Sequence, residues 1–325
     1  MANTKIKMKK SQSLKKPVSK SISKKKPISS KKIFARIARK VFLKSRLTKK
    51  ASALKKKTVK KPNREFPGKY VAHLDHEYFT GIPGLDELLG HGIPIGSSVL
   101  VEGGPGSGKT ILCLNIAANF CRAGRKVLYM SFEEPEEHLL SHMEKFGWEA
   151  TKFIDKDLLR VKRFNAIDVA RSVEALLSEA KKELLIEVHP VFFPEDFKPD
   201  LVIIDSLTSI SSAFSGEESR FRIYMEQLFR YLEKENISSL LIREISNPSH
   251  TGGIYVERGE AVSFLSDGII IIYNVIYPNG RRGSGFEVLK LRGEPIERKI
   301  VEMKIAKGGI VIYPDKKIGN ECSLT

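Results

Sequence analysis

The sequence predicts an α/β fold with a mainly parallel twisted sheet, flanking helices and a C-terminal antiparallel extension. Through the central part of the chain, short apolar runs alternate with longer segments whose apolar residues recur every three or four positions, as strands and helices do in parallel sheets. From residue 264 onward, apolar runs follow one another and are joined by glycine-containing turns. A glycine-rich segment, residues 103–110, links the first central strand to the first helix.

The central strands are short runs rich in Val, Ile and Leu, which pack well in a buried sheet. They are expected at Ser97–Glu102, Lys126–Ser131, Leu159–Lys162, Leu201–Asp205 and Ser238–Glu244. Helices are expected where the apolar residues fall on one helical face, at Thr110–Ala123, Pro135–Phe146, Ala166–Ile186 and Glu217–Lys234. The extension is expected to hold strands at Phe264–Tyr277, Gly285–Leu291, Lys299–Ile305 and Gly309–Tyr313.

The charge of the 325-residue chain is unevenly distributed. The whole chain has a formal net charge of +18, but residues 1–67 hold 25 basic residues and one acid, Glu65, so the remainder carries −6. Residues 1–66 are rich in Lys and Ser, repel themselves and have little to bury, which predicts a disordered tail. One segment within it, Lys32–Leu47, has the pattern of a short basic amphipathic helix for an anionic surface. Residues 67–325 are predicted to form a single domain.

Such a cationic tail attracts DNA, RNA, anionic lipid or an acidic protein through screened attraction and counterion release, without sequence preference. Nucleic acid is the partner that we favour. A membrane surface, an acidic protein and a purely solubilising role are the open alternatives.

The composition also excludes several classes of protein. Three cysteines at unrelated spacings, Cys113, Cys121 and Cys322, cannot build a disulfide framework or a four-thiolate zinc site, and a reducing, cytoplasmic setting is therefore expected. The longest strongly apolar run, Gly268–Tyr277, is far shorter than the roughly 20 residues of a transmembrane helix, so no transmembrane segment is expected. No apolar stretch of the kind found in a secretory signal follows the charged N-terminus.

The segment VLVEGGPGSGKT has the spacing of a phosphate-binding loop between a strand and a helix. Its glycines let successive amide N–H groups point at an anion, and the helix adds its N-terminal partial positive charge. Lys109 is predicted to reach the β- and γ-phosphates of ATP, and the Thr110 hydroxyl to ligate Mg²⁺. The predicted nucleotide-binding residues are Gly103, Gly104, Pro105, Gly106, Ser107, Gly108, Lys109, Thr110 and Ile111.

Carboxylates are expected at the ends of two further strands, where open parallel sheets bind their ligands. LVIIDS is an apolar strand that ends in Asp205, which is predicted to hold the metal through a bound water. The strand that ends in SFEEPEE brings Glu133 and Glu134 to the same edge, where one of them is predicted to position or deprotonate the attacking water. Adjacent strand residues point to opposite faces, so the two glutamates cannot point the same way.

Six motifs together carry a family resemblance. They are TGIPGLDELLGHGIPIGSSVLVEGGPGSGKT, SFEEPEE, FGWE, LVIIDSLT, FLSDGIIII and VLKLRG, and they cover nearly everything from Phe79 to about Tyr313. In this order they resemble the KaiC group of RecA-like ATPases. The resemblance implies a single RecA-like core that binds ATP with Mg²⁺ and hydrolyses ATP slowly, in a homo-oligomer that is commonly a ring, here expected to be hexameric.

The resemblance also implies roles for particular residues. Glu133 and Glu134 fall on the family's paired catalytic glutamates, and Glu244 falls on a sensing position. Lys290 and Arg292 match the LKxRG pair that reaches the γ-phosphate of a neighbouring subunit, where fixed cations neutralise charge in the transition state. The alternative is that Lys290 and Arg292 are ordinary solvent-exposed residues on one face of a strand.

The chain departs from the family's clock protein in two respects. It has one such domain where the clock protein has two, and Ser263 is followed by Phe264 where adjacent Ser and Thr are autophosphorylated, so autokinase activity is not expected. Two alternative functions stay open. One is a RecA-like recombination ATPase driven by DNA, and the other is a nucleotide-gated regulatory module without significant hydrolysis.

Overall fold

The computed structural model of the chain describes residues 77–82, 84–90, 92–180, 193–194, 196–214, 216–245, 260–319 and 321–324. The basic tail and the end of the third predicted helix, residues 181–186, lie outside the described residues. The predictions for those two segments are therefore not addressed by the structure.

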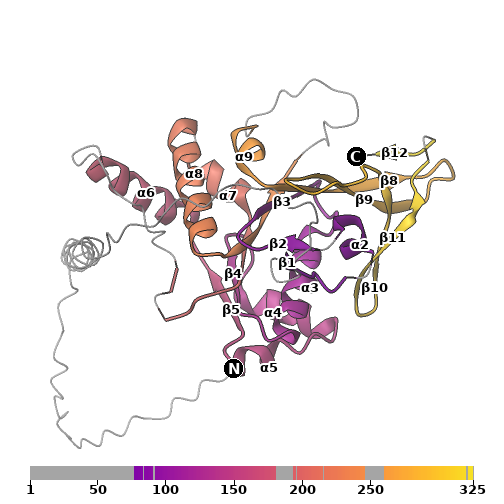
Figure 1. Ribbon diagram of the computed structural model, residues 1–325, viewed down its shortest axis with the longest axis horizontal. Coiled ribbons are helices and arrows are strands. Elements are labelled where there is room, and N and C mark those ends of the chain that lie inside the picture. Colours follow the sequence, from indigo (N-terminus) through magenta and orange to yellow (C-terminus); the bar gives the residue numbers. More distant parts are fainter. Residues whose placement is uncertain are drawn as a thin grey trace, which may run out of the picture. The chain divides into compact units, whose positions relative to one another are not determined.

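A mixed sheet with a parallel centre forms the middle of the described part (Figure 1). Its strand order is β11-β10-β9-β8-β3-β7-β6-β4-β5, and β12 pairs with β8. The short strands β1 (Glu77–Tyr78) and β2 (Ile93–Pro94) form a separate ribbon. The main sheet contains β3 (Ser98–Gly103), β4 (Val127–Ser131), β5 (Leu159–Arg163), β6 (Leu201–Asp205), β7 (Ser238–Glu244), β8 (Gly268–Ile276), β9 (Arg282–Leu291), β10 (Val301–Ala306), β11 (Gly309–Lys317) and β12 (Ser323–Leu324).

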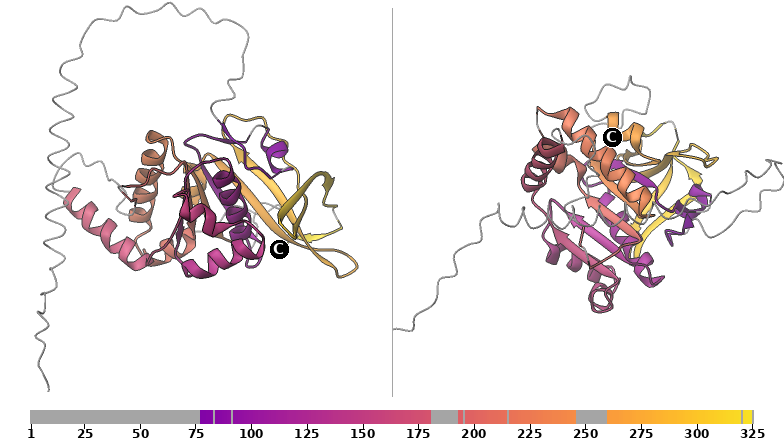
Figure 2. Two further views of the ribbon diagram at one scale, coloured as in Figure 1. Left: turned by 90° about the horizontal axis from the view of Figure 1, so that it is seen from below. Right: turned by 60° about the vertical axis from the view of Figure 1, so that its left-hand side comes forward.

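Helices cover both faces of the parallel part, because successive strand residues point to opposite sides. Val99 and Val101 of β3 pack in one apolar cluster and Leu100 in the other. The first cluster contains residues of α2 (Leu85–Leu89), α3 (Lys109–Arg122), α4 (Glu136–Lys145) and α5 (Ala150–Asp155). The second contains residues of α6 (Ala166–Ala180), α7 (Leu207–Ala213), α8 (Glu218–Lys234) and α9 (Glu260–Leu265). Figure 2 shows the two sets of helices on opposite sides of the sheet.

The predicted α/β fold class is confirmed. The five predicted central strands and four helices correspond to β3–β7 and to α3, α4, α6 and α8, with ends that differ by at most one residue within the described part. The prediction for Phe264–Tyr277 was wrong at its start, because Phe264 and Leu265 belong to α9. The strand that follows, β8, is also not purely part of an antiparallel extension, since it pairs in parallel with β3 and antiparallel with β9.

The parallel register brings the C-terminal ends of four strands to the same side of the sheet, which we call the carboxyl edge. Gly103 of β3 lies beside Glu244 of β7, and Ser131 of β4 lies beside Asp205 of β6. The segments that leave these strands therefore start close together, as open parallel sheets require of a binding edge. Among the described helices, none combines the length and apolarity needed to span a membrane.

Candidate functional site

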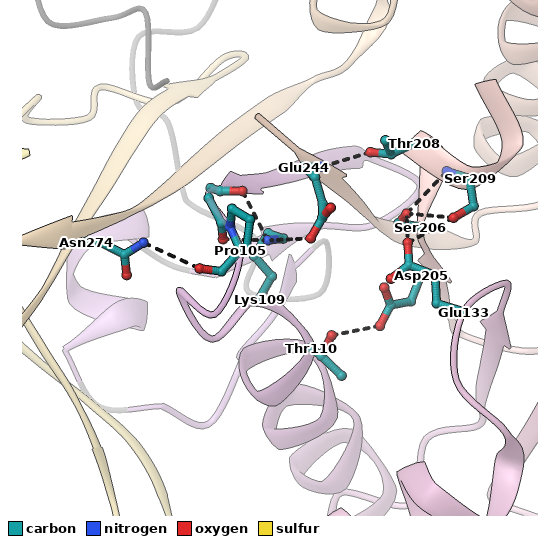
Figure 3. Close-up of polar contacts among 12 residues, drawn as sticks. Pro105, Lys109, Thr110, Glu133, Asp205, Ser206, Thr208, Ser209, Glu244 and Asn274 are labelled. Carbon is teal, nitrogen blue, oxygen red and sulfur yellow. Dashed lines mark hydrogen bonds and ion pairs between the residues drawn. The ribbon is translucent and has the colours of Figure 1, made fainter. Parts of the chain in front are cut away.

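The loop from Gly103 to Thr110 wraps around the N-terminus of α3 at this edge (Figure 3). Gly103 needs its lack of a side chain, because a Cβ there would lie 2.4 Å from the carbonyl oxygen of Ile272. Gly108 has a φ of 101°, a left-handed conformation that L side chains rarely adopt, and it directly precedes the helix. Both predicted glycines are thus required by the backbone path of the loop.

The remaining loop residues differ in how far they are exposed. Gly104 and Ser107 are buried, Pro105 and Gly106 are exposed, and Ile111 packs half-buried against the first apolar cluster. The hydroxyl of Ser107 has no hydrogen-bond partner within the described part of the chain. Buried polar atoms are normally satisfied, so this hydroxyl marks a place where the loop can accept a polar ligand.

Lys109 is held inside the loop. Its ammonium donates to the carbonyl oxygens of Gly103 at 3.0 Å and Gly104 at 2.9 Å, and its side chain is 6% exposed. Glu244, at the end of β7, places Oε1 3.6 Å from the same ammonium (Figure 3). The amide of Glu244 in turn donates to the Thr208 hydroxyl of α7 at 2.9 Å. The predicted phosphate-binding cation and the predicted sensor are therefore in direct contact.

Asp205 and Thr110 meet across the edge. The Thr110 hydroxyl donates to Oδ2 of Asp205 at 2.9 Å, and the buried Tyr129 hydroxyl of β4 donates to the same oxygen at 2.6 Å. Burial raises the pKa of the Asp205 carboxyl above its usual value, with a further increase from the nearby Glu133 and Glu134, while the two hydrogen bonds act in the opposite direction. Nothing in the sequence pattern singled out Tyr129, which appeared only as an apolar residue of a strand.

The two glutamates after β4 point to different partners. Oε1 of Glu133 accepts hydrogen bonds from the hydroxyls of Ser206 and Ser209, the latter at 2.9 Å, at the start of α7 (Figure 3). Oε2 of Glu134 lies 3.9 Å from Nδ1 of His142 on α4. The prediction that the pair cannot point the same way is in keeping with these contacts. Both carboxylates nevertheless remain near Asp205, since both act on its pKa.

A magnesium ion fits this edge together with a nucleotide. Mg²⁺ prefers oxygen ligands and is commonly held by one or two protein groups plus substrate phosphates and waters. Thr110 and Asp205 supply such oxygens 2.9 Å apart, beside the loop. Within the described ranges, no group of three or more His, Cys, Asp or Glu side chains is arranged to hold a metal by itself. The donor set therefore suits a metal that arrives with phosphate oxygens.

Two further contacts frame the loop. Asn274 of β8 donates from Nδ2 to the Pro105 carbonyl oxygen at 3.5 Å. Ile305 of β10, which is 45% exposed, approaches the loop closely, because a Cβ on Gly108 would lie 3.0 Å from its Cδ1. Sequence reasoning missed both residues because they come from the extension, far along the chain.

Lys290 and Arg292 are not brought to the phosphate loop of their own chain. Lys290 of β9 donates to the carbonyl oxygens of Ser263 at 3.2 Å and Ser266 at 2.6 Å, and Arg292 donates to Asp267 at 2.9 Å. The amide of Asp267 donates to the carbonyl of Ser98, which begins β3, whereas the loop follows the end of β3. The two cations thus lie near the N-terminal ends of the parallel strands, whereas the phosphate loop lies at their C-terminal ends. Burial lowers the pKa of Lys290, and the charge of Arg292 lowers it further.

The region that contains these residues is similar to known proteins. Residues 78–317 match the protein family described as "ATPase: KaiC". The chain is 30% identical over 242 residues to a UPF0273 protein of Pyrococcus horikoshii, and the aligned region covers 73% of this chain and 94% of that protein. It is 29% identical over 246 residues to a UPF0273 protein of Thermotoga maritima, which spans 73% of this chain and 96% of that protein.

A third relative is longer than the matched region. The circadian clock oscillator protein KaiC of Synechococcus elongatus is 26% identical over 238 residues, which spans 72% of this chain and 44% of that protein. The family match at residues 78–317 includes the phosphate loop, the strand-end carboxylates and the two cations Lys290 and Arg292.

Proposed function

Because the chain belongs to the KaiC family of RecA-like P-loop ATPases, we propose that the edge cluster binds ATP with Mg²⁺ and hydrolyses its γ-phosphate bond. The observation that carries this proposal is the contact between Thr110 and Asp205 at 2.9 Å beside the ammonium of Lys109. A hydroxyl, a carboxylate and an ammonium at the start of one helix are the groups that a metal-bound triphosphate requires.

In this proposal the loop residues bind the phosphates of ATP, and the carboxylates hold the metal and orient the attacking water. Main-chain amides from Gly104 to Thr110 cradle the phosphates at the positive end of α3. Lys109 exchanges its carbonyl partners for phosphate oxygens, a stronger interaction because both groups are charged. Thr110 and Asp205 hold Mg²⁺, which when bound neutralises charge on the phosphate oxygens. Glu244, next to Lys109, is placed to sense whether the γ-phosphate is present.

Glu133 or Glu134 positions the water that attacks the γ-phosphate. Glu133 has its orientation fixed by Ser206 and Ser209, which is the geometric requirement for a base that must hold one water in line. Glu134 has a histidine as its nearest partner. Turnover by this arrangement alone is slow, because Lys109 is the one lysine or arginine that pairs with a carboxylate of the edge cluster within the described residues.

The missing cations come from a neighbouring subunit. Lys290 and Arg292 lie at the opposite edge of the parallel sheet, so a head-to-tail contact between copies brings them to the next subunit's phosphates. Head-to-tail contacts that close form rings, here a hexamer. In this proposal the protein is a slow, cytoplasmic ATPase with a regulatory or assembly role, and the tail of residues 1–66 binds nucleic acid.

Calorimetry and turnover test the proposal on the full-length chain. We expect wild-type protein to bind Mg·ATP and release phosphate, and Lys109→Ala to bind it at least 100-fold more weakly, from the loss of about 3 kcal/mol of charged hydrogen bonding. Lys198→Ala is the matched control, since that exposed lysine pairs only with Glu235 among its described contacts. A folded wild-type chain without affinity for ATP contradicts the proposal.

Two other outcomes would support a different function for the protein. Binding of ATP without hydrolysis in single-turnover experiments supports a nucleotide-gated regulatory module. A strong stimulation of phosphate release by single-stranded DNA supports a recombination-type ATPase.

A further inference from the structure

The outer face of the C-terminal extension carries two tyrosines among basic side chains. Tyr277 follows β8, and Tyr313 lies on β11, with the two strands β9 and β10 between them in the sheet. Both rings are partly exposed. We call this set the tyrosine–cation surface, and it consists of Tyr277, Arg281, Lys304, Tyr313, Lys316 and Lys317.

Cations contact both rings. The guanidinium carbon of Arg281 lies 5.6 Å from the centroid of the Tyr277 ring. The ammonium groups of Lys316 and Lys304 lie 4.3 Å and 5.2 Å from the centroid of the Tyr313 ring. These are cation–π contacts, in which a positively charged group lies over the face of an aromatic ring. This combination is the one that stacks bases and contacts phosphates in proteins that bind single strands.

A hollow lies between the strands of this surface. A cavity of about 290 Å³ is lined by the ring of Tyr277, by Arg281, Lys316 and Lys317, and by Glu302. Asn279, Ile318 and Gly319 complete its lining. The Tyr277 ring packs against Gly283 of β9, where a Cβ would come within 2.8 Å of the ring. Its volume is near the lower end of the range for ligand pockets, roughly 300 Å³, which suits one nucleotide unit.

The charges of the surface favour an anion. Glu302 accepts from Lys304 at 2.9 Å and lies 3.7 Å from Lys316, and these cations hold the pKa of its carboxyl below the usual value. Lys317 is 3.4 Å from a second carboxylate, Glu297, and the charge of Arg281 also acts on Glu302 from beyond ion-pair distance. The surface thus sets the four cations Arg281, Lys304, Lys316 and Lys317 against the two carboxylates Glu302 and Glu297. A positive excess therefore remains along the hollow, beside the two rings.

The surface is separate from the phosphate loop. Lys304 and Ile305 are neighbours on β10, so their side chains leave opposite faces of the sheet, and it is Ile305 that approaches Gly108. The strand β8 pairs Ile272 with Gly103 and continues for four further residues toward Tyr277. A ligand on this surface thus occupies neither the loop nor the strand-end carboxylates.

We propose that the tyrosine–cation surface binds single-stranded nucleic acid, with a base against Tyr277 in the hollow and the backbone phosphates on Arg281, Lys316 and Lys317. An acidic polypeptide uses only the cations and is repelled by Glu302. A base stacks on the ring, and an N–H group on its edge, such as the ring N–H of thymine, donates to the Glu302 carboxylate, which no phosphate needs to approach. This inference does not depend on the proposed ATP hydrolysis.

Base-dependent binding by the full-length chain tests the proposal. The basic tail contacts phosphates whatever the base, so the informative quantity is the ratio of affinities for oligothymidylate and for an abasic strand of equal length, measured by fluorescence anisotropy. We expect oligothymidylate to bind about tenfold more tightly, as stacking of one or two bases gives. Tyr277→Ala and Tyr313→Ala should each remove most of this ratio, whereas Tyr277→Phe, which keeps the ring, should retain it.

Photocrosslinking supplies the second measurement. Irradiation of the complex should attach thymidine to Tyr277 or Tyr313, as mapped by mass spectrometry of the full chain. Phe79→Ala removes an aromatic ring that is 59% exposed outside the surface and should leave both readouts unchanged. Equal affinity for the abasic strand, or equally effective competition by polyglutamate of the same charge, overturns the proposal. Phosphate release from ATP should be the same in all four variants, so a failure here leaves the proposed ATPase function intact.

Discussion

The carboxylate of Glu244 lies 3.6 Å from the ammonium of Lys109, at the point where a γ-phosphate is expected. Glu244 ends β7 and Lys109 begins α3, and the pairing of Glu244 with Gly103 at the end of β3 brings the two residues together. Lys109 is almost fully buried, whereas the Glu244 side chain is 43% exposed, so water screens much of their attraction. A phosphate that binds Lys109 must therefore also approach a negative charge.

We expect Glu244→Gln to tighten ATP binding by about two- to fivefold. The substitution removes a carboxylate beside the phosphates, and a partly exposed pair of this kind contributes up to about 1 kcal/mol. Titration calorimetry with Mg·ATP measures the change, and Glu235→Gln, at the exposed pair with Lys198, serves as the control. Weaker binding by Glu244→Gln would show that the carboxylate contacts the bound nucleotide or its metal directly.

Substitution of the paired glutamates should separate binding from turnover. Glu133→Gln with Glu134→Gln keeps the size of both side chains but removes the base, so phosphate release should fall by about 10²–10³-fold at unchanged ATP affinity. The single substitutions then identify which residue positions the water. Ser206 and Ser209 orient Glu133, so we expect Glu133→Gln to have the larger effect. Full turnover by the double variant would exclude both residues.

Asp205→Asn should stabilise the nucleotide-free protein at neutral pH while abolishing its response to Mg²⁺. Burial holds the pKa of Asp205 above its usual value, so the folded chain binds the proton more tightly than the unfolded chain does. The ionised carboxylate therefore reduces stability as the pH rises through the raised pKa, and the amide avoids this cost.

We expect a gain of about 1 kcal/mol in urea unfolding at neutral pH. The gain should shrink as the pH falls toward the ordinary Asp value, where the wild-type group is already protonated. Destabilisation at neutral pH would instead mean that the carboxylate's bonds with Tyr129 and Thr110 outweigh its burial.

Mixing two inactive variants should restore activity if subunits share the site. Lys290→Ala with Arg292→Ala leaves the phosphate loop intact, and Lys109→Ala leaves Lys290 and Arg292 intact. In a mixed ring, some interfaces combine an intact loop with intact cations, so phosphate release should reappear on mixing. Absence of any recovery in a sample that forms mixed assemblies by native mass spectrometry would assign Lys290 and Arg292 only to their contacts with residues 263–267 of their own chain.

Removal of residues 1–66 should weaken binding to duplex DNA, because these residues carry a net charge of +24 whereas the remainder of the chain carries −6. The affinity of the full-length chain should fall steeply with salt concentration, and that of the shortened chain should fall less. The same affinity for both chains would reject nucleic acid as the partner of the tail.

The sequence determined the local features of this protein. Residue spacing alone located the phosphate loop, since a glycine is required at Gly103 by the close approach of Ile272 and at Gly108 by its left-handed φ. Apolar runs located the central strands because those strands are buried on both faces. The start of β8 was misplaced because Phe264 and Leu265 are apolar residues of a short helix, and an apolar run does not distinguish helix from strand.

Only the tertiary structure decided which residues meet. Tyr129 reads in the sequence as one more strand residue, yet its hydroxyl bonds Asp205 across 76 positions of the chain. Ile305 reaches Gly108 from the extension, and Lys290 and Arg292 lie at the edge of the sheet away from the loop. Local spacing fixes what a segment can do, but strand order and register, which depend on packing of the whole sheet, fix what it faces.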